Sequence, residues 1–518
     1  MKKILKENRF FACICVVMSI YYLYRLFAIT PWYDEVYTYL SFIDKGFFFS
    51  ITHWPLPNNH ILFSALSSFL RPAGVYIALR GISYLSAVGT LILLYMFLKK
   101  VFGKGVATVG VMLYTVLHSV NVLAVQGRGY SFATFCFMLS IYSVYQIVWN
   151  HEKAKRFYIL FSLSLFMGLY TLVSSVYWVM VVCACGGLML LIQKRYKEFW
   201  KLVLYALLAA VVTFLAYSIV WLAIGSNMLI DTNELYMQES HVSMILKNPF
   251  LCLAEGFQLM ANNPYMQGFD SRSVFLNDFV YFGRTILGSF FNVQSSVLWY
   301  AFTVIVLALS VLCVVIAVKQ FANKEKKDMQ GTCFALALSG LGFLVIFFVL
   351  FVQCAYPFTR VFSFVGILLA IQAGLFIHWL QQLCERFYKN NRVNVIISGL
   401  MAVGCICLLL SPNYNKGYSS LDDNAYDAIE HIEWNGVESY AASDVFINQQ
   451  IQYHCIMGDN MKLQEDRVAP QIVFVKKDSG LESWSNLIVD FEVYGLDQRA
   501  VLYENGDYIV YGKGKQEE

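Results

Sequence analysis

The sequence predicts a polytopic α-helical membrane protein of about 11 transmembrane helices with a small extracytoplasmic α/β domain at its C-terminal end. The first observation behind this fold class is composition. Of the 518 residues, 58% are hydrophobic and only 14% are charged, whereas soluble domains contain about 25% charged residues. With a mean hydropathy of +0.56, a soluble globule of this length would expose a large apolar surface. Disordered, collagen-like and small disulfide-stapled proteins are excluded by the same composition.

The second observation is a series of about 11 apolar stretches, each long enough for a helix of about 17–25 residues that crosses a bilayer. One continuous apolar run, Phe157 to Ile192, is too long for a single span and is divided near Tyr170–Val173. Residues 1–411 are therefore predicted to form a transmembrane module, with extracytoplasmic loops near 31–75 and 225–296. The predicted spans lie near residues 10–30, 76–98, 104–120, 130–149, 157–171, 172–192, 202–224, 297–318, 332–353, 361–380 and 393–411.

The third observation is the distribution of charge. Residues 1–411 contain 30 Lys and Arg against 15 Asp and Glu, and residues 412–518 contain 8 against 19. Six alternate loops of the transmembrane module contain 21 of the 30 basic residues, and basic loops stay in the cytoplasm. The N-terminus is then cytoplasmic, and an odd number of spans places the acidic C-terminal domain outside. Nucleic-acid binding is not indicated, because the basic residues sit in short loops and not in one stripe.

The two ends of the chain support this organisation. The run Phe10–Thr30 follows a basic start, but it is long and bulky and has no small-residue cleavage site, so a retained first span is favoured over a signal peptide. Residues 412–518 contain a helical segment, LDDNAYDAIEHIEW, and strand-like segments QIVFVKK, LIVDFEVYG, RAVLY and YIVYG. The 13 cysteines lie mostly inside apolar runs, so no disulfide framework is expected.

Two adjacent acids, Asp34 and Glu35, follow the first span among aromatic residues. Carboxylates next to apolar surface lose hydration, which costs free energy unless a partner or a reaction uses them. A partly desolvated carboxylate suits a general base or a ligand for a divalent cation. The alternative is structural, because acids are favoured in the first turn of a helix.

Three arginines are predicted to lie at the same outer interface. Arg128, in QGRGYSF, opens the fourth span, Arg360, in YPFTRVF, opens the tenth, and Arg80 lies near the start of the second. A guanidinium group can bind a phosphate through two parallel hydrogen bonds. The alternative for each arginine is snorkelling to lipid headgroups.

The first outer loop also contains His53, Asn59 and His60, around the segment WPLPNN. Together with Tyr130 these residues are predicted to bind substrate. A metal site of histidine and carboxylate is conceivable, but the spacing is not diagnostic, and substrate hydrogen bonding or loop packing is favoured. Metal ligands are therefore left unassigned.

The ordered set of motifs resembles the polyprenyl-phosphate-sugar glycosyltransferases of the GT-C superfamily. The likeness is greatest to glycosyltransferase family 39, with its protein O-mannosyltransferases, and to lipid A aminoarabinose transferase. It covers residues 1–150 and, more loosely, 351–380. The motifs that carry it are WYDEVYTYL, THWPLPNNHILF, LRGISYLSAVGTLILLYMFLKK, RGYSF and PFTRVFSF.

The resemblance implies a glycosyltransferase in a bacterial cell membrane. It would move a hexosyl or pentosyl group from a polyprenyl-phosphate donor to a hydroxyl of a lipid, glycan or protein acceptor, with inversion, on the extracytoplasmic side. Asp34 would be the catalytic base, Glu35 would support its loop, and Arg128, Arg360 and Arg80 would bind the donor phosphate. A divalent metal cofactor stays open, because Gln126 and Gly127 stand where many relatives have an acidic residue before the arginine.

Two other classes were weighed. A lipid-linked saccharide flippase or transporter would place paired charges in the middle of its spans, where this sequence has almost none. A non-catalytic envelope assembly protein would not need acids and arginines gathered at one interface. The glycosyltransferase hypothesis requires Asp34 to face a cavity at the outer surface, within about 10–12 Å of Arg128 or Arg360.

Overall fold

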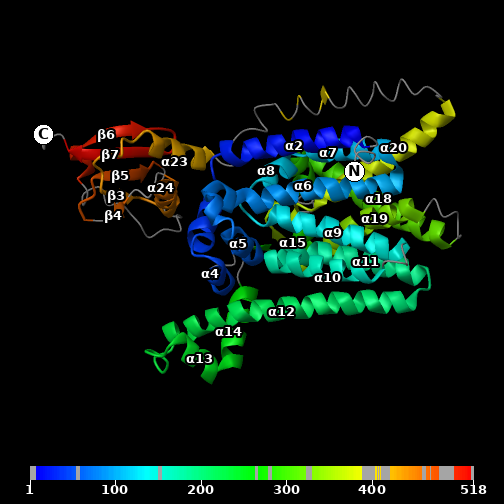
Figure 1. Cartoon of the computed structure of the whole chain (residues 1–518), viewed down its shortest axis with the longest axis horizontal. Helices are drawn as coiled ribbons and strands as arrows, with labels where there is room; N and C mark the ends of the chain where they lie inside the picture. Colours follow the sequence, from blue (N-terminus) through cyan, green and yellow to red (C-terminus); the bar gives the residue numbers. More distant parts are fainter. Residues whose placement is uncertain are drawn as a thin grey trace.

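The computed structural model describes residues 8–53, 59–149, 154–262, 266–277, 283–293, 295–322, 330–387, 403–404, 407, 409, 420–457, 462–466, 468–477 and 495–514. Most of the described chain is a bundle of long helices, and a small sheet domain lies beyond one end of it (Figure 1). The protein is a multi-pass membrane protein with a C-terminal mixed α/β unit, as the composition predicts.

Within the described residues, eight helices are long and apolar enough to cross a membrane. A helix bonds nearly all of its backbone groups internally, as a bilayer requires, and these helices bury very different shares of their surface inside the bundle. These helices are α2 (Arg9–Ala28), α6 (Val75–Phe102), α9 (Tyr130–Trp149), α11 (Val176–Ile192), α12 (Tyr196–Thr232), α18 (Ser296–Ala322), α19 (Gln330–Gln353) and α20 (Val365–Phe387).

The predicted span 104–120 is bent. Helices α7 (Lys104–Thr115) and α8 (His118–Ala124) meet at 72° and together make a ninth candidate span. At the bend, the side-chain amide of Asn121 donates hydrogen bonds to the carbonyl oxygens of Thr115 and Leu117, and the Leu117 carbonyl also accepts the backbone N–H of Asn121.

The remaining two predicted spans differ from the others. Residues 157–171 lie in α10 (Ala154–Thr171), a helix that is not among the eight apolar ones, since Lys155 and Arg156 lie in its first turn. The chain breaks after Thr171 at a 3₁₀ turn, η4 (Val173–Ser175), where the long apolar run is predicted to divide. The predicted span 393–411 lies outside the described residues except for four positions near its end.

Short elements connect the spans at the end that faces the sheet domain (Figure 1). The first outer loop contains α3 (Tyr33–Thr38), the π-helical turn η1 (Tyr39–Ile43), α4 (Phe47–Thr52), α5 (Ile61–Ser68) and η2 (Arg71–Ala73). The second contains α13 (His241–Lys247), α14 (Pro249–Asn262), β1 (Met266–Gly268), α15 (Arg272–Asn277), η5 (Arg284–Gly288) and α17 (Ser289–Phe291). Strand β1 pairs antiparallel with β2 (Ala355–Pro357), directly before η7 (Thr359–Phe362).

The C-terminal unit is a five-stranded mixed sheet of order β4-β3-β5-β7-β6 with two helices. Strand β3 is parallel to β4 and β5, whereas β7 is antiparallel to β5 and β6. The predicted strand LIVDFEVYG lies almost wholly outside the described residues. The elements are α23 (Ser420–Glu430), β3 (Ser439–Ala442), α24 (Val445–Met457), β4 (Gln464–Glu465), β5 (Ile472–Lys476), η8 (Leu496–Gln498), β6 (Arg499–Glu504) and β7 (Tyr508–Gly514).

Candidate active site

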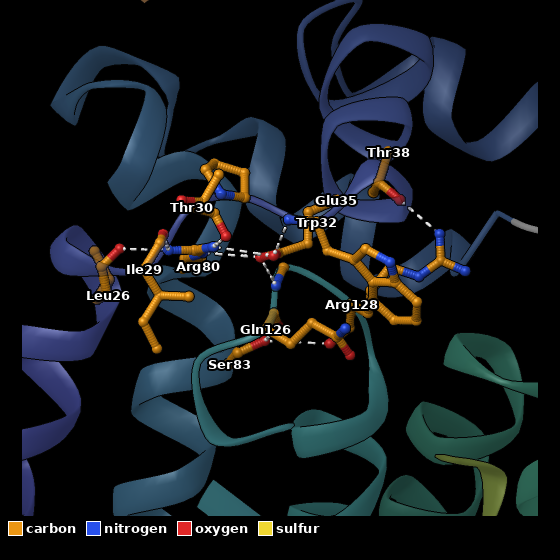
Figure 2. Close-up of polar contacts among 12 residues, drawn as sticks. Leu26, Ile29, Thr30, Trp32, Glu35, Thr38, Arg80, Ser83, Gln126 and Arg128 are labelled. Carbon is orange, nitrogen blue, oxygen red and sulfur yellow. Dashed lines mark hydrogen bonds and ion pairs between the residues drawn. The ribbon is translucent and has the colours of Figure 1, made fainter. Parts of the chain in front are cut away.

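Glu35 and Arg80 form a fully buried ion pair beneath the first outer loop (Figure 2). The Arg80 Nε and Nη2 atoms donate to the two Glu35 carboxylate oxygens at 2.8 and 2.9 Å. The same oxygens accept hydrogen bonds from the backbone N–H groups of Trp32 and Gly127. Four donors therefore surround the Glu35 carboxylate, which explains how a buried charge is tolerated.

The rest of the Arg80 guanidinium binds the chain that leaves the first span. Its Nη1 atom donates to the carbonyl oxygens of Leu26 and Ile29, both at 2.8 Å, and Nη2 approaches the Thr30 carbonyl at 3.4 Å. Arg80 thus joins the end of α2, the start of α3 and the Gln126–Gly127 segment. For Glu35 the helix-start interpretation of the acid pair holds, because its carboxylate accepts the Trp32 N–H at the beginning of α3.

Asp34 points elsewhere. Its Oδ2 atom lies 2.9 Å from Nη1 of Arg360, and 13% of the Asp34 side chain and 24% of the Arg360 side chain are exposed. This distance meets one of the two conditions of the sequence hypothesis, and the other, a cavity beside Asp34, stays a prediction. Two neighbours on one short helix therefore form ion pairs with two different arginines, one buried and one at the surface.

Aromatic rings surround the Arg360 guanidinium. Its central carbon lies 4.9 Å from the ring centres of Trp32 and Phe358 and 5.9 Å from that of Tyr130, distances at which a cation is attracted to a ring face. Burial opposes the charge of Arg360, but the Tyr130 hydroxyl and the Asp34 carboxylate together raise its pKa. The guanidinium is thus a permanent cation beside Asp34.

Arg128 also contacts α3. Its Nη1 atom donates to the Thr38 hydroxyl at 2.8 Å and approaches the Asp34 backbone carbonyl at 3.2 Å, and its Nη2 atom lies 3.3 Å from Nε2 of His60. Arg128 and His60 are both buried. Arg128 therefore contacts α3, the short helix from which the Asp34 side chain reaches Arg360.

The protonation of His60 follows from its partners. The backbone N–H of Gly129 donates to Nδ1 at 2.7 Å, so Nδ1 has no proton. Burial, followed by the charges of Arg128 and Arg360, lowers the pKa of His60 well below its ordinary value, so the ring is neutral. The single proton is then on Nε2, and this N–H faces the Nη2 donor of Arg128. Two donors meet there, and an oxygen acceptor lying beside both nitrogens would accept a hydrogen bond from each.

Two glycines make this arrangement possible. A Cβ atom on Gly127 would lie 2.6 Å from Leu79 and 3.0 Å from the Glu35 carboxylate, and one on Gly129 would lie 2.3 Å from Thr171 Cγ2 and 3.2 Å from His60 Nδ1. Ser83 of α6 also donates to the Gln126 carbonyl oxygen at 2.6 Å. The QGRGY segment therefore approaches both loop residues more closely than any other residue type allows.

The other predicted substrate-binding residues lie around this cluster. Tyr130 contacts the His60 ring edge-on, with ring centres 5.0 Å apart. Asn59 is buried and donates to the carbonyl oxygens of Ser50 and His53 at 2.8 and 2.9 Å. The His53 side chain, whose pKa is lowered by burial and by Lys45, lines a cavity of about 390 Å³ between α4 and helices α12–α14.

The C-terminal unit contacts the helix that carries Asp34. The backbone N–H of Tyr33 donates to the Asp422 carboxylate at 2.9 Å, and the Gln450 side chain donates to the Pro31 carbonyl at 3.2 Å. The Tyr33 ring also packs on Phe446, with centres 3.9 Å apart. Asp422, Phe446 and Gln450 could not be singled out from the sequence. The segment LDDNAYDAIE indicates a helix, but nothing in it indicates a contact with the first outer loop.

No metal centre is formed by the described part of the chain, where no three His, Cys, Asp or Glu side chains converge as metal ligands would. The residues around Asp34 supply cations and neutral donors instead. The question of a metal cofactor is left to a chelator experiment.

No family profile matches the chain, and no curated protein matches it in sequence. Solved structures do match it. The Archaeoglobus fulgidus oligosaccharyltransferase in complex with zinc and sulfate aligns with a TM-score of 0.47 and 12% identity over 85% of this chain and 61% of its own. ArnT from Cupriavidus metallidurans bound to undecaprenyl phosphate aligns with a TM-score of 0.41 and 8% identity over 99% of both chains.

The matched structures are GT-C glycosyltransferases. The same archaeal enzyme, AglB, in complex with an inhibitory peptide and a dolichol-phosphate, aligns with a TM-score of 0.45 and 10% identity over 86% of this chain and 64% of its own. This chain thus spans about three fifths of the length of the archaeal oligosaccharyltransferase.

Proposed function

We propose that the protein is an integral membrane glycosyltransferase that moves a sugar from a polyprenyl-phosphate donor to an acceptor hydroxyl on the extracytoplasmic side, with Asp34 as the base. The observation that carries the proposal is the grouping at one end of the bundle. There the Asp34 carboxylate lies 2.9 Å from Arg360, and Arg128, which faces neutral His60, contacts the same short helix. The donor class comes from the sequence resemblance.

The proposed reaction is a single displacement. Asp34 accepts the proton of the acceptor hydroxyl while that oxygen forms a bond to the anomeric carbon of the sugar. The bond from that carbon to the phosphate oxygen breaks, and its electron pair leaves with the polyprenyl phosphate, so the configuration inverts. The developing charge on the phosphate is stabilised by Arg360 and by the facing donors of Arg128 and His60.

Glu35 and Arg80 have a positioning role in this proposal. Every donor position of the Arg80 guanidinium meets a carbonyl or a Glu35 oxygen, so none is left for a ligand. The donor phosphate is therefore assigned to Arg128 and Arg360, and the buried pair fixes the loop from which Asp34 projects. Tyr130 and Asn59 support His60, and His53 is placed at the adjoining cavity.

The proposed orientation combines the basic loops with the shape of the molecule. The first residues of α2 and of α12 lie at the end of the bundle opposite the sheet domain (Figure 1). These are basic regions, which favours a cytoplasmic position. Eleven spans within residues 1–411 would then place the domain of residues 412–518, together with Asp34, outside the membrane.

The test is transfer by the purified protein in lipid vesicles, with a panel of polyprenyl-phosphate sugars and candidate acceptors, with and without a chelator. Asp34→Asn is expected to lower turnover by about 10²–10⁴-fold, as loss of a general base does. Asp44→Asn is the matched control, since Asp44 is an exposed acid on the same loop.

Full activity of Asp34→Asn would remove the base assignment. Movement of the intact donor across the membrane by the wild type, without transfer, would instead support the flippase alternative. The chelator arm decides whether a divalent metal takes part.

A further inference from the structure

The second outer loop presents an exposed apolar surface. We call residues 233–262 the outer hairpin; it consists of a turn followed by α13 and α14. Leu235, Leu246 and Phe250 are 86%, 77% and 85% exposed. Further exposed apolar residues of the outer hairpin are Met237, Val242, Leu251 and Phe257. A contiguous surface of this kind is not stable against water and marks a site of contact.

The outer hairpin is a packed element. It has a small core of its own, in which Met244 and Cys252 are fully buried against α12. A Cβ atom on Gly225 of α12 would lie 1.9 Å from the Cys252 carbonyl, and one on Gly256 would lie 2.2 Å from the Trp221 carbonyl. The backbones of α12 and α14 therefore touch, and the hairpin presents its apolar residues from a fixed position on that helix.

Helix α12 shows where the outer hairpin lies relative to the membrane. The large apolar side chains of α12 that are exposed run from Tyr196 to Ile219, and none is exposed from Val220 to Thr232. Counting the roughly 20 residues that cross a bilayer from Lys201 also ends near Val220. The lipid-facing surface of α12 thus ends where α14 covers it, and the exposed residues of the hairpin continue the apolar surface outward.

We propose that the outer hairpin lies in the membrane–water interface and that its exposed apolar residues insert into the outer leaflet. Interfacial helices bury such side chains to about 5–10 Å at the boundary between headgroups and acyl chains. Charges of the hairpin fit this depth, because Lys247 forms an ion pair with Glu239 at 2.6 Å and remains half exposed toward the headgroups. Only the choice of leaflet rests on the proposed function; contact with lipid does not.

The experiment measures quenching of tryptophan emission by brominated lipid. The full-length protein is reconstituted in phosphatidylcholine vesicles, and the emission of Phe250→Trp and Leu246→Trp is compared with that of the wild type. The matched control is Val468→Trp, since Val468 of the sheet domain is 84% exposed, like Phe250. Bromine near the glycerol is expected to remove most of the added emission of both hairpin variants and none of that of the control.

Bromine near the chain ends is expected to quench the hairpin variants less, as a shallow position requires. Equal, unquenched emission from the hairpin variants and the control would overturn the proposal. A cross-link between two copies of the protein at position 250, without quenching, would also overturn the proposal. The exposed apolar surface would then be a contact between protomers. Neither result depends on transferase activity, so this failure is distinct from a failure of the proposed function.

Discussion

At the residue scale, two neighbouring acids have separate tasks. Glu35 lies in a fully buried pair with Arg80, whereas Asp34 meets Arg360 at a partly exposed position. Removing one partner of a buried ion pair leaves the other charge uncompensated, which costs about 3–5 kcal/mol. Surface ion pairs contribute about 0–1 kcal/mol, and the Asp34–Arg360 pair, which solvent partly reaches, is expected to contribute less than the buried pair. Substitution of Glu35 should therefore lower mainly the stability of the protein, and substitution of Asp34 should lower mainly its activity.

The first prediction follows from this contrast. Glu35→Gln is expected to lower the melting temperature of the purified protein strongly, and Asp34→Asn only slightly while transfer is lost. Thermal unfolding of both variants beside a transfer assay checks this. A stable Glu35→Gln protein with wild-type melting would contradict the positioning role of the pair.

The second prediction concerns pH. The folded pKa of His60 lies well below its usual value, chiefly through burial, so at low pH the unfolded chain binds a proton that the folded protein does not. Stability contributed by neutral His60 is complete above about pH 6.5, the unfolded value, and is lost as pH falls below it. Melting temperatures between neutral and acid pH should fall less steeply in His60→Gln than in the wild type.

At the element scale, the QGRGY segment sets how closely the first loop approaches the bundle. Gly129→Ala would place a Cβ atom 2.3 Å from Thr171 Cγ2, and overpacking of this kind costs about 1–3 kcal/mol. Both melting temperature and turnover are expected to fall, and Thr171→Ser in the same protein should restore part of each. Gly105→Ala is the control, since its added Cβ would have only Gln381 as a neighbour, at 3.8 Å.

The elements differ in how far the sequence reveals them. The long spans were predictable because an apolar run of sufficient length has no stable alternative to a helix in lipid. The bend between α7 and α8 was not, since residues 115–118 contain neither proline nor glycine. The grouping of Asp34 with Arg128 and Arg360 followed from charge scarcity and from motifs, whereas the tautomer of His60 depends on one backbone N–H that only coordinates reveal.

At the scale of the whole molecule, the C-terminal unit holds the helix that carries Asp34. The Tyr33 N–H and the Asp422 carboxylate that accepts it are separated by 389 positions, and a contact of this range leaves no periodicity or local charge pattern in a sequence. The composition of the C-terminal domain does not indicate its role. These contacts indicate that one part of this role is to hold α3 in position.

A prediction tests this role. Asp422→Ala is expected to reduce kcat about tenfold with little change in KM for the donor, as loss of a hydrogen bond to a charged group of about 1.5 kcal/mol would. Asp422→Asn keeps an acceptor oxygen and should retain most of the activity. Asp497→Ala, at an exposed acid of the same unit, is the control. A fall in KM alone, or equal loss in both Asp422 variants, would contradict the hydrogen-bonding role.

The contact between the two ends of the chain also bears on biosynthesis. The loop with Asp34 is synthesised long before Asp422 and Gln450, which contact it. The hydrogen bonds that hold α3 to the C-terminal unit can therefore form only after the chain has been synthesised as far as these two residues. A nascent chain without them would have an incomplete site, so activity would depend on synthesis and docking of the C-terminal unit.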